Sequence, residues 1–253
     1  MKKKLLPSAL ALCAAACGDA ATGTKIGNPG AQFSQLRVEL TAWSSDEAVA
    51  TIPHPRALTT GVVITRAILG VEELRLVPAL PDGTCPLVDD GPEIEREFTA
   101  DLVAGTPLPP IEVPRNDRFC EFRVELEEGA DLQGTEHGAL LGEAELLVEG
   151  ARGDGTPFVL RTRDIGEIRF RRSTPFTFTA DALWYLAFDV ASWFAAVELD
   201  AASVGTDGTI RIDDRENEPL LEQFLAAFEA GTDACDDDDD DRFENDCDDD
   251  DDD

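Results

Sequence analysis

The chain has 253 residues, of which 53 are Asp or Glu and 21 are Lys or Arg, which gives a net charge of −32 at pH 7. A surface this acidic repels phosphate backbones and anionic headgroups, so the composition argues against nucleic acid and acidic lipid as partners. The length suits one globular domain, flanked here by two ends of unusual composition.

The first residues predict an export signal. Residues 2–4 are lysines and residues 5–16 are mostly apolar, and a short basic region followed by such a run is typical of secretory signals. The run is too short to span a bilayer, which takes about 20 apolar residues. A buried N-terminal helix of a cytosolic protein is the alternative, which three lysines beside an alanine-rich run disfavour. We therefore expect residues 1–16 to be a signal peptide.

The residue that follows this signal is a cysteine, and its surroundings predict lipidation. The string Ala-Ala-Ala-Cys-Gly-Asp around Cys17 resembles the lipobox of bacterial lipoproteins, whose cysteine receives a diacylglycerol and becomes the first residue. The lipobox usually has Leu where this chain has Ala14, and cleavage after Ala16 to a soluble secreted protein is the alternative. Lipoproteins of this type carry three acyl chains, and two or more hold a protein stably. The prediction is a bacterial outer membrane lipoprotein, facing the periplasm or the surface.

The middle of the chain predicts one β domain. Residues 17–32 are rich in Gly, Ala, Thr and Pro and predict a flexible tether, and residues 33–231 form the domain. Apolar and polar residues alternate strictly over residues 36–42 and 120–126, which is typical of half-buried strands. Further short strands are predicted at residues 62–65, 74–77, 144–148, 158–162, 168–171 and 176–179.

The turns between these runs indicate the fold class. The sequence Gly-Asp-Gly-Thr at residues 153–156 lies between two predicted strands, and an Asp-Gly pair in that place is a strong hairpin signal. Many short strands separated by Gly, Pro and Asp turns, without alternating helices, predict a mainly β fold. We expect an antiparallel β-sandwich, with a barrel as the alternative.

The densest aromatic segment covers residues 183–199 and predicts a strand that leads into a short helix. Its aromatic side chains are Trp184, Tyr185, Phe188, Trp193 and Phe194. Aromatic residues gathered in this way usually fill a core, and the lining of a binding site is the alternative.

One short amphipathic helix is predicted near the C-terminus, at residues 219–230. Its apolar residues recur at helical spacing and are Leu220, Leu221, Phe224, Leu225 and Phe228. Asn217 is the expected cap and Gly231 the expected stop. We expect the apolar stripe to pack on the sheet, and a partner protein in the envelope is the alternative.

Four cysteines remain after Cys13 leaves with the signal and Cys17 is acylated, and they predict disulfides. These four are Cys85, Cys120, Cys235 and Cys247. An even number of cysteines in an oxidising compartment indicates pairing. The most local of the three pairings joins Cys85 to Cys120 and Cys235 to Cys247. Zinc is the alternative, which the absence of paired Cys-x-x-Cys spacing disfavours.

The last segment, residues 232–253, predicts a disordered acidic tail. From residue 233 onward it holds 14 Asp, one Glu and one Arg, and blocks of like charge repel one another and stay unfolded. Carboxylates are also the ligands that Ca²⁺ prefers, so the tail is a candidate for Ca²⁺ binding with a Kd of about 10⁻⁴–10⁻³ M. A tail that only raises solubility is the alternative. The candidate ligands are Asp236, Asp237, Asp238, Asp239, Asp240, Asp241, Asp246, Asp248, Asp249 and Asp250.

The sequence carries no catalytic signature. It lacks the Gly-x-Ser-x-Gly elbow, the His-Glu-x-x-His zinc motif, the phosphate-binding glycine loop and the dinucleotide fingerprint. Its two histidines, His54 and His137, both stand in turn-like segments. We therefore expect a protein that is not an enzyme and that holds no cofactor other than weakly bound Ca²⁺.

Several short strings resemble a family of uncharacterised lipoproteins from myxobacteria and related deltaproteobacteria. They are Gly-Asn-Pro at 27–29, Ile-Thr-Arg-Ala at 64–67, Leu-Arg-Leu-Val at 74–77, Asp-Leu at 101–102 and Phe-Asp-Val at 188–190. The resemblance covers most of residues 17–232 and implies a transthyretin-like β-sandwich and an envelope location, without site residues. The expected function is a structural or binding role on a lipid anchor. The alternative is an exported Ca²⁺-binding protein that uses its tail.

Overall fold

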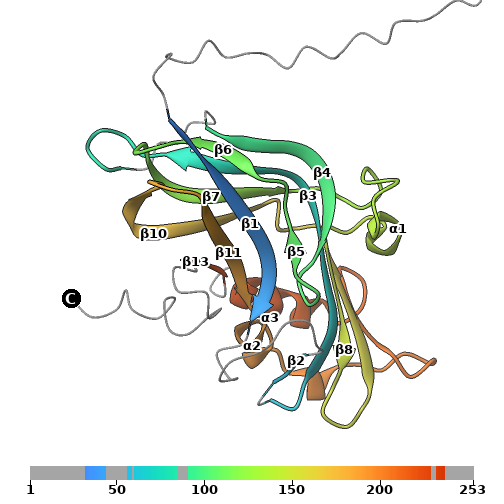
Figure 1. The fold of residues 1–253 in the computed structure, drawn as a ribbon. Coiled ribbons are helices and arrows are strands. Elements are labelled where there is room, and N and C mark those ends of the chain that lie inside the picture. The colour runs from blue at the N-terminus through green and yellow to red at the C-terminus, as the bar shows by residue number, and fades with distance from the viewer. Residues whose placement is uncertain (1–31, 44–55, 59, 85–90, 229–231, 237–253) are drawn as a thin grey trace, which may run out of the picture. The chain divides into compact units, whose positions relative to one another are not determined.

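The computed structural model describes residues 32–43, 56–58, 60–84, 91–228 and 232–236 (Figure 1). The chain is mainly β, as the sequence predicts, with two mixed sheets and few helices. The predicted signal peptide, Cys17 and most of the tether lie outside the described residues. Within the described part of the chain, no helix is both long enough and apolar enough to span a membrane.

The smaller sheet has five strands in the order β13-β11-β1-β5, with β6 also paired to β1. Its strands are β1 (Phe33–Trp43), β5 (Thr106–Pro107), β6 (Ile111–Pro114), β11 (Ala182–Asp189) and β13 (Thr232–Asp236). Strands β1 and β11 run parallel, in register from Leu36 beside Ala182 to Trp43 beside Asp189. The other pairs in this sheet are antiparallel.

The larger sheet has eight strands in the order β10-β7-β3-β8-β9-β12, with β2 and β4 also paired to β3. Its strands are β2 (Arg56–Ala57), β3 (Val63–Pro78), β4 (Glu93–Asp101), β7 (Arg118–Leu126), β8 (Leu146–Ala151), β9 (Pro157–Thr162), β10 (Glu167–Thr177) and β12 (Ile210–Ile212). The predicted hairpin is present, because β8 and β9 pair antiparallel around the Asp-Gly turn. Strands β9 and β12 pair parallel.

The prediction that all strands pair antiparallel is therefore wrong at β1–β11 and at β9–β12. Alternation and turn residues identify strands and the hairpins between neighbours in sequence. They carry no information on how two strands pair when more than a hundred residues separate them, as between β1 and β11. The smaller sheet is mixed because of this long-range pair, and the larger sheet is mixed because of β9 and β12, which are not consecutive strands either.

Strand β3 is one continuous strand of 16 residues, whereas the sequence predicted two short runs with an unclear segment between them. The unclear segment is buried on both faces, which removes the alternation that marks a half-buried strand. Ala67 and Leu69 point into the main core. Ile68 points the other way, into a small cluster with Leu132, Leu141 and Leu147.

Gly70 marks the point where β3 changes partners on one of its edges. Strand β8 pairs with β3 up to Leu69, and β7 pairs with it from Val71 onward. The Gly70 N–H donates to the carbonyl of Glu145 at 2.8 Å, and the Glu127 N–H donates to the carbonyl of Gly70 at 3.1 Å. The chain between these two strands, which includes the short helix α1 (Gly138–Leu141), leaves and returns at this position.

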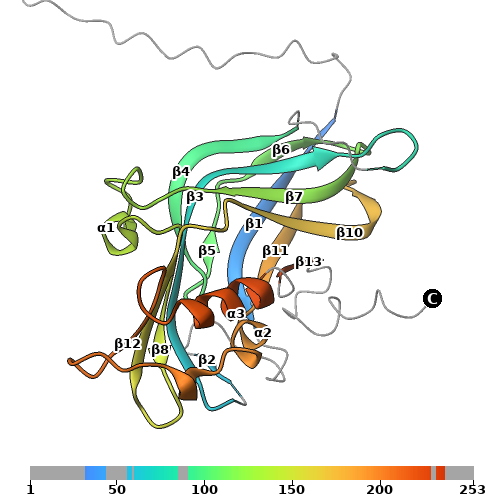
Figure 2. The same ribbon diagram turned by 180° about the vertical axis from the view of Figure 1, so that it is seen from behind.

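Side chains from both sheets form one hydrophobic core. The Phe122 ring of β7 lies 5.2 Å from the Trp184 ring of β11, and the Phe170 ring of β10 lies 5.2 Å from the Phe188 ring of β11. Figure 1 shows β1 and β11 in front of β7 and β10, and Figure 2 shows the reverse order from behind.

The aromatic segment forms β11 followed by the helix α2 (Val190–Ala195), as the sequence predicts. All five of its aromatic side chains are buried, so core packing is confirmed over a binding-site lining. The 3₁₀ turn η1 (Leu199–Ala201) follows.

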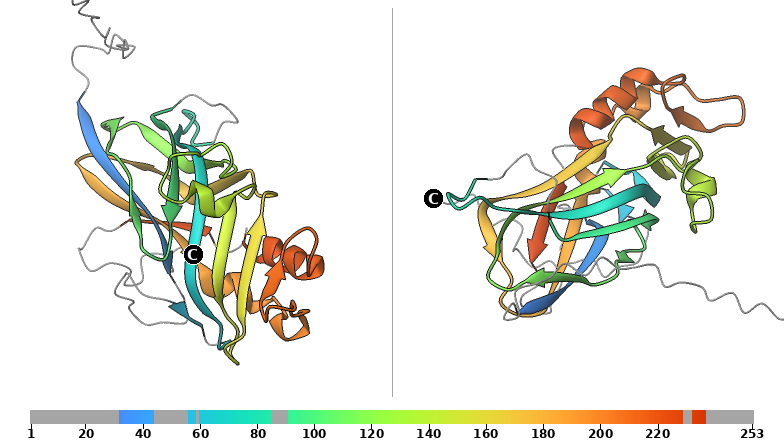
Figure 3. Two further views of the ribbon diagram at one scale, coloured as in Figure 1. Left: turned by 90° about the vertical axis from the view of Figure 1, so that its right-hand side faces the viewer. Right: turned by 90° about the horizontal axis from the view of Figure 1, so that it is seen from above.

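The helix α3 (Glu218–Phe228) buries Leu220, Leu221, Phe224 and Phe228. Its stripe meets the rings of α2, since Trp193 lies 4.9 Å from Phe228 and Phe194 lies 5.7 Å from Phe224. In the left view of Figure 3, α3 (orange-red) lies to the right of the strands β3, β8 and β9.

Asn217 precedes α3, but its side chain does not cap the helix. Its backbone carbonyl accepts from the N–H groups of Leu220 and Leu221. Its side-chain amide instead donates to the carbonyl of Arg211 at 2.6 Å and accepts from the Ser203 N–H at 2.7 Å. The residue thus ties the start of α3 to the segment around β12. The expected stop, Gly231, lies outside the described residues.

The boundary of the predicted disordered tail at residue 232 is wrong. Residues 232–236 form β13, which pairs antiparallel with β11 from Phe188 beside Thr232 to Trp184 beside Asp236. The acidic composition gave no sign of this strand. Its backbone pairs with the edge of β11 that would otherwise be exposed. Residues 237–253 lie outside the described part of the chain.

Candidate anion-binding pocket

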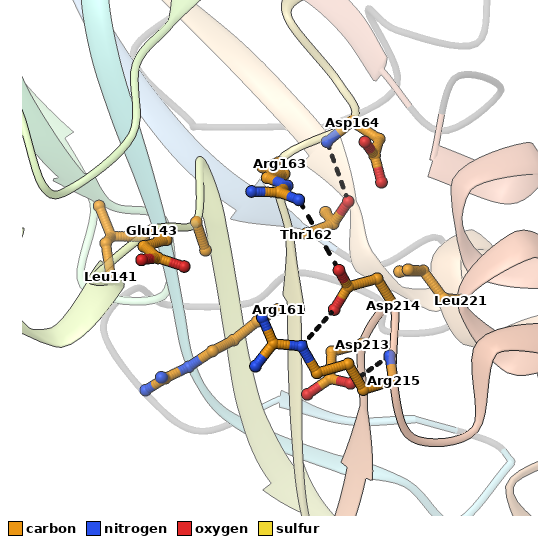
Figure 4. A pocket seen from close by; sticks show the side chains of 11 residues that line it. Leu141, Glu143, Arg161, Thr162, Arg163, Asp164, Asp213, Asp214, Arg215 and Leu221 are labelled. Atoms are coloured by element: carbon orange, nitrogen blue, oxygen red, sulfur yellow. Dashed lines mark hydrogen bonds and ion pairs between the residues drawn. The ribbon is translucent and has the colours of Figure 1, made fainter.

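A pocket with a volume of about 320 Å³ lies between the end of β9, the loop after β12 and the start of α3 (Figure 4). Its charged lining residues are Arg161, Arg163, Arg215, Glu143, Asp164, Asp213 and Asp214. Leu141, Ala144, Thr162 and Leu221 complete it. Three guanidinium groups around one pocket are unusual in a chain with so few cations.

Strand β9 sets the positions of two of these arginines. Phe158, Leu160 and Thr162 are buried along one face of the strand. Arg161 and Arg163 have the opposite parity and are exposed, because successive side chains of a strand point to opposite faces. The pattern Arg-Thr-Arg thus places two guanidinium groups on the outer side of the strand end.

The loop after β12 supplies the third arginine. The Asp213 carboxylate accepts from the backbone N–H groups of Arg215 and Glu216, each at 2.8 Å. A short acidic side chain that binds the backbone two residues on is a common means of closing a turn. The turn leaves the side chains of Asp214 and Arg215 at the pocket (Figure 4).

The ion pairs in this pocket are long. Asp214 lies 3.8 Å from the Arg163 guanidinium and 3.6 Å from that of Arg215, and these arginine side chains are 52% and 80% exposed. Arg161 donates to the carbonyl of Leu140 at 3.1 Å and makes no ion pair with any described residue. A guanidinium has five N–H donors, so each of the three retains donors for another acceptor.

Elsewhere the arginines are engaged more tightly. On the outer face of the larger sheet, Glu121 is fully buried and accepts from Arg123 at 2.6 Å and from Arg171 at 2.8 Å. Burial raises the pKa of Glu121, but the hydrogen bonds from these two arginines outweigh it and leave the pKa below its ordinary value. These two arginines share one buried carboxylate through short hydrogen bonds, whereas the ion pairs of Arg163 and Arg215 are 3.8 Å and 3.6 Å long.

Glu145 binds the backbone of the turn next to the pocket. Its side chain is buried, and one carboxylate oxygen accepts from the N–H groups of Ile165 at 3.0 Å and Gly166 at 2.8 Å. Burial raises the pKa of this carboxyl, and the two backbone hydrogen bonds offset that rise only in part. Glu145 therefore holds the turn that follows Arg163 and Asp164.

The structure does not bring the sequence-predicted site residues together. Cys17, Cys85, Cys247 and all the candidate aspartates from 237 onward lie outside the described residues. Cys235 and Asp236 belong to β13, where only the backbone is described. Cys120 is buried in β7, with its sulfur 3.7 Å from the carbonyl oxygen of Val77. Among the described residues, no group of three or more metal-binding side chains occurs.

His137 does not line the pocket and immediately precedes α1, where its backbone N–H donates to the hydroxyl of Thr99 at 3.3 Å. His54 lies outside the described residues. Sequence reasoning missed the pocket itself. Arg161 and Arg163, two residues apart at a strand end, gave a usable signal, but Arg215 is far away in the sequence and gave none.

The comparisons with known proteins add no relative. No protein-family model, no curated protein and no solved structure matches this chain. The resemblance to myxobacterial lipoproteins with a transthyretin-like domain therefore stays a prediction.

Proposed function

We propose that this protein is a lipid-anchored protein of the bacterial cell envelope that binds a small anionic ligand without chemical change. The observation that carries the proposal is the pocket between β9 and α3, where Arg161, Arg163 and Arg215 retain unused donors. The N-terminal signal and Cys17 support the anchor, and the lack of catalytic motifs supports a binding role.

The net charge of the whole chain determines what a site for an anion must contain. A net charge of −32 repels anions at long range, so an anionic ligand needs a local cluster of cations to be held. Guanidinium groups match the geometry of carboxylate and phosphate oxygens, often through two parallel hydrogen bonds. The pocket supplies three guanidinium groups beside four carboxylates, so an anion depends on the N–H donors that those carboxylates leave unused. The pocket volume lies in the range of small-molecule sites.

Calorimetric titration of the mature protein with inorganic phosphate tests the proposal. We expect saturable binding that weakens about tenfold or more in Arg163→Gln and in Arg215→Gln, since each loses charge-assisted hydrogen bonds. Arg66→Gln is the control, because Arg66 is also exposed but pairs with Glu149 at 2.5 Å, away from the pocket. Equal phosphate binding by all variants, or none by the wild type, would contradict the proposal.

Mass spectrometry of the mature N-terminus tests the anchor. Acyl mass on Cys17 supports it, and a free α-amine on Cys17 without acyl mass contradicts it. The anchor and the pocket are separate parts of the proposal, so one result does not decide the other.

A second candidate function is Ca²⁺ binding by the acidic tail. It is favoured by β13, which ends at Asp236 on the edge of the folded domain, directly before the long aspartate run. The test compares Ca²⁺ titration of the full chain with that of a chain ending at Asp236. This end point keeps β13, whereas removal from residue 233 would also expose the edge of β11. Equal heats from the two chains would contradict the candidate.

We also propose that the two sheets form a β-sandwich with α3 at one end, and that Cys85 pairs with Cys120. The shared core and the contacts across it support the sandwich. The pairing is supported by the Ala79 N–H, which donates to the carbonyl of Arg118 at 2.7 Å and holds the chain after β3 beside β7. Peptide mapping of the unreduced protein tests the pairing, and a Cys85 peptide joined to another cysteine would contradict it.

A further inference from the structure

A second pocket adjoins the arginine pocket and differs from it in chemistry. Its volume is about 270 Å³, and it is lined by Asp164, Ile165, Glu167, Ile168, Arg169, Leu225 and Phe228. Four of these side chains are apolar. Ile165 and Leu225 are only half-buried, so they leave apolar surface in contact with water.

The two pockets lie next to each other along one side of α3. Asp164 lines both of them. On the helix, Leu221 borders the arginine pocket, and Leu225 and Phe228 border the apolar one. Residues four and seven positions apart share a helix face, and this face extends about 10 Å at 1.5 Å per residue. A ligand could therefore contact both pockets at once.

Two of the three charged side chains at the apolar pocket, Glu167 and Arg169, are paired within the protein, and the third, Asp164, is exposed to solvent. Glu167 accepts from Arg169 at 2.6 Å and lies 3.3 Å from the Arg123 guanidinium. These pairs reduce the repulsion that Glu167 would exert on an anionic ligand and leave Arg169 engaged. The two pockets together form a groove along α3. The guanidinium N–H groups that remain available to a ligand lie at one end of this groove, and the exposed apolar surface lies at the other.

We propose that the ligand is an amphipathic anion, with its anionic head at Arg163 and Arg215 and an apolar chain along Leu225 and Phe228. This inference rests on the proposed function and specifies its ligand class. The chain removes apolar surface of Ile165 and Leu225 from water, which is the source of the added affinity.

Octanoate, butyrate and octanol are the probes, titrated into the full mature chain with binding followed by amide chemical shifts. Octanoate is expected to bind at least about tenfold more tightly than butyrate, since each added methylene buries apolar surface. It is also expected to bind more tightly than octanol, which lacks the anionic head. The shifts should include the backbone amides of both Asp214 and Leu225. Equal affinities for octanoate and butyrate, or for octanoate and octanol, would overturn the inference.

Variants separate the two halves of the groove. Leu225→Gln is expected to remove most of the advantage of octanoate over butyrate and to leave phosphate affinity unchanged. Ala226→Gln, on the exposed face of the same helix, is the matched control. If Leu225→Gln fails to fold, Ile165→Gln replaces it with the same expectation. Arg163→Gln should weaken octanoate and phosphate alike.

The outcomes distinguish this inference from the proposed function. Phosphate binding that depends on Arg163, combined with octanoate binding that ignores Leu225 and Ile165, overturns the amphipathic ligand alone. If the wild type binds neither phosphate nor octanoate, both proposals are overturned.

Discussion

The Trp184 and Phe122 rings lie 5.2 Å apart, and the two residues belong to different sheets. Phe122 is fully buried and also stacks on Phe176, with ring centroids 5.7 Å apart. This aromatic group joins β7 and β10 of the larger sheet to β11 of the smaller sheet. Large aromatic side chains thus form part of the core that the two sheets share.

Phe122→Ala should lower the free energy of unfolding by about 3–5 kcal/mol, the usual cost of removing a buried aromatic ring and leaving a cavity. Chemical denaturation of the mature protein measures the loss. Phe33→Ala is the control, since Phe33 is 46% exposed and surface changes usually stay within about 0.5 kcal/mol. Similar losses in the two variants would mean that the aromatic group does not join the sheets.

Glu121→Gln should lower the free energy of unfolding at neutral pH by about 3–5 kcal/mol, because it removes the charge that pairs with buried Arg123 and with Arg171. The pKa of Glu121 is lowered in the folded state. Its ionised form therefore stabilises the fold above the ordinary pKa of 4.5, and this contribution is lost as pH falls through the lowered pKa.

Denaturation from pH 7 down to pH 2 measures this effect, and the difference between wild type and Glu121→Gln should shrink at the acid end. The control is Glu95→Gln, at an exposed position of β4. A difference that stays constant over the whole range would contradict the role of the Glu121 charge.

Glu145 should act in the opposite direction. Its pKa is raised above 4.5 in the folded state, mainly by burial, so its protonated form is favoured by folding. The resulting stability is fully present below pH 4.5 and is lost as pH rises through the raised pKa. Glu145→Gln keeps an acceptor for Ile165 and Gly166 and removes the titration. It should therefore be at least as stable as the wild type at pH 7 and less sensitive to pH.

Glu145→Ala distinguishes hydrogen bonding from charge. It leaves two backbone N–H groups without their acceptor, which should cost about 1–3 kcal/mol. Thermal unfolding of the three proteins from pH 4 to pH 8 checks both expectations. A Gln variant that is as unstable as the Ala variant at pH 7 would show that the ionised carboxylate is the needed acceptor.

The sequence predicted those strands that bury one face and expose the other, and that are joined to the next strand by a short turn. Strand β9 alternates buried and outward residues and follows an Asp-Gly turn, so its hairpin with β8 was predictable. Strand β4 was missed because its sequence is Glu-rich and its consecutive exposed residues 95–97 break the alternation of a half-buried strand. Strand β13 was missed because Asp residues dominate the segment that contains it. In both strands the backbone pairing overrides the weak preference of acidic residues for β structure.

The pocket was harder to predict than the fold, for a geometric reason. Arg163 directly follows β9 and Asp214 lies in the loop after β12, and the parallel pairing of these two strands brings the residues together. Because the direction of that pairing is not encoded locally, the pocket could not be inferred before the sheet was known.

Gly70 offers a test of the point where β7 and β8 diverge from β3. A Cβ atom added at Gly70 would lie 2.1 Å from the carbonyl oxygen of Glu127 and 2.8 Å from a methyl group of Leu132. The carbonyl belongs to the backbone that pairs with Gly70, so relief of the clash must move β3 or the chain after β7. Gly70→Ala should therefore lower the free energy of unfolding by about 1–3 kcal/mol or more, as overpacking does, despite the lower entropy of its unfolded chain.

Gly153→Ala is the control, because its added Cβ would meet only an ordinary contact at 3.5 Å. Chemical denaturation should show a clear loss for the first variant and little change for the second, and equal stability of the two would contradict the close approach of backbone at Gly70.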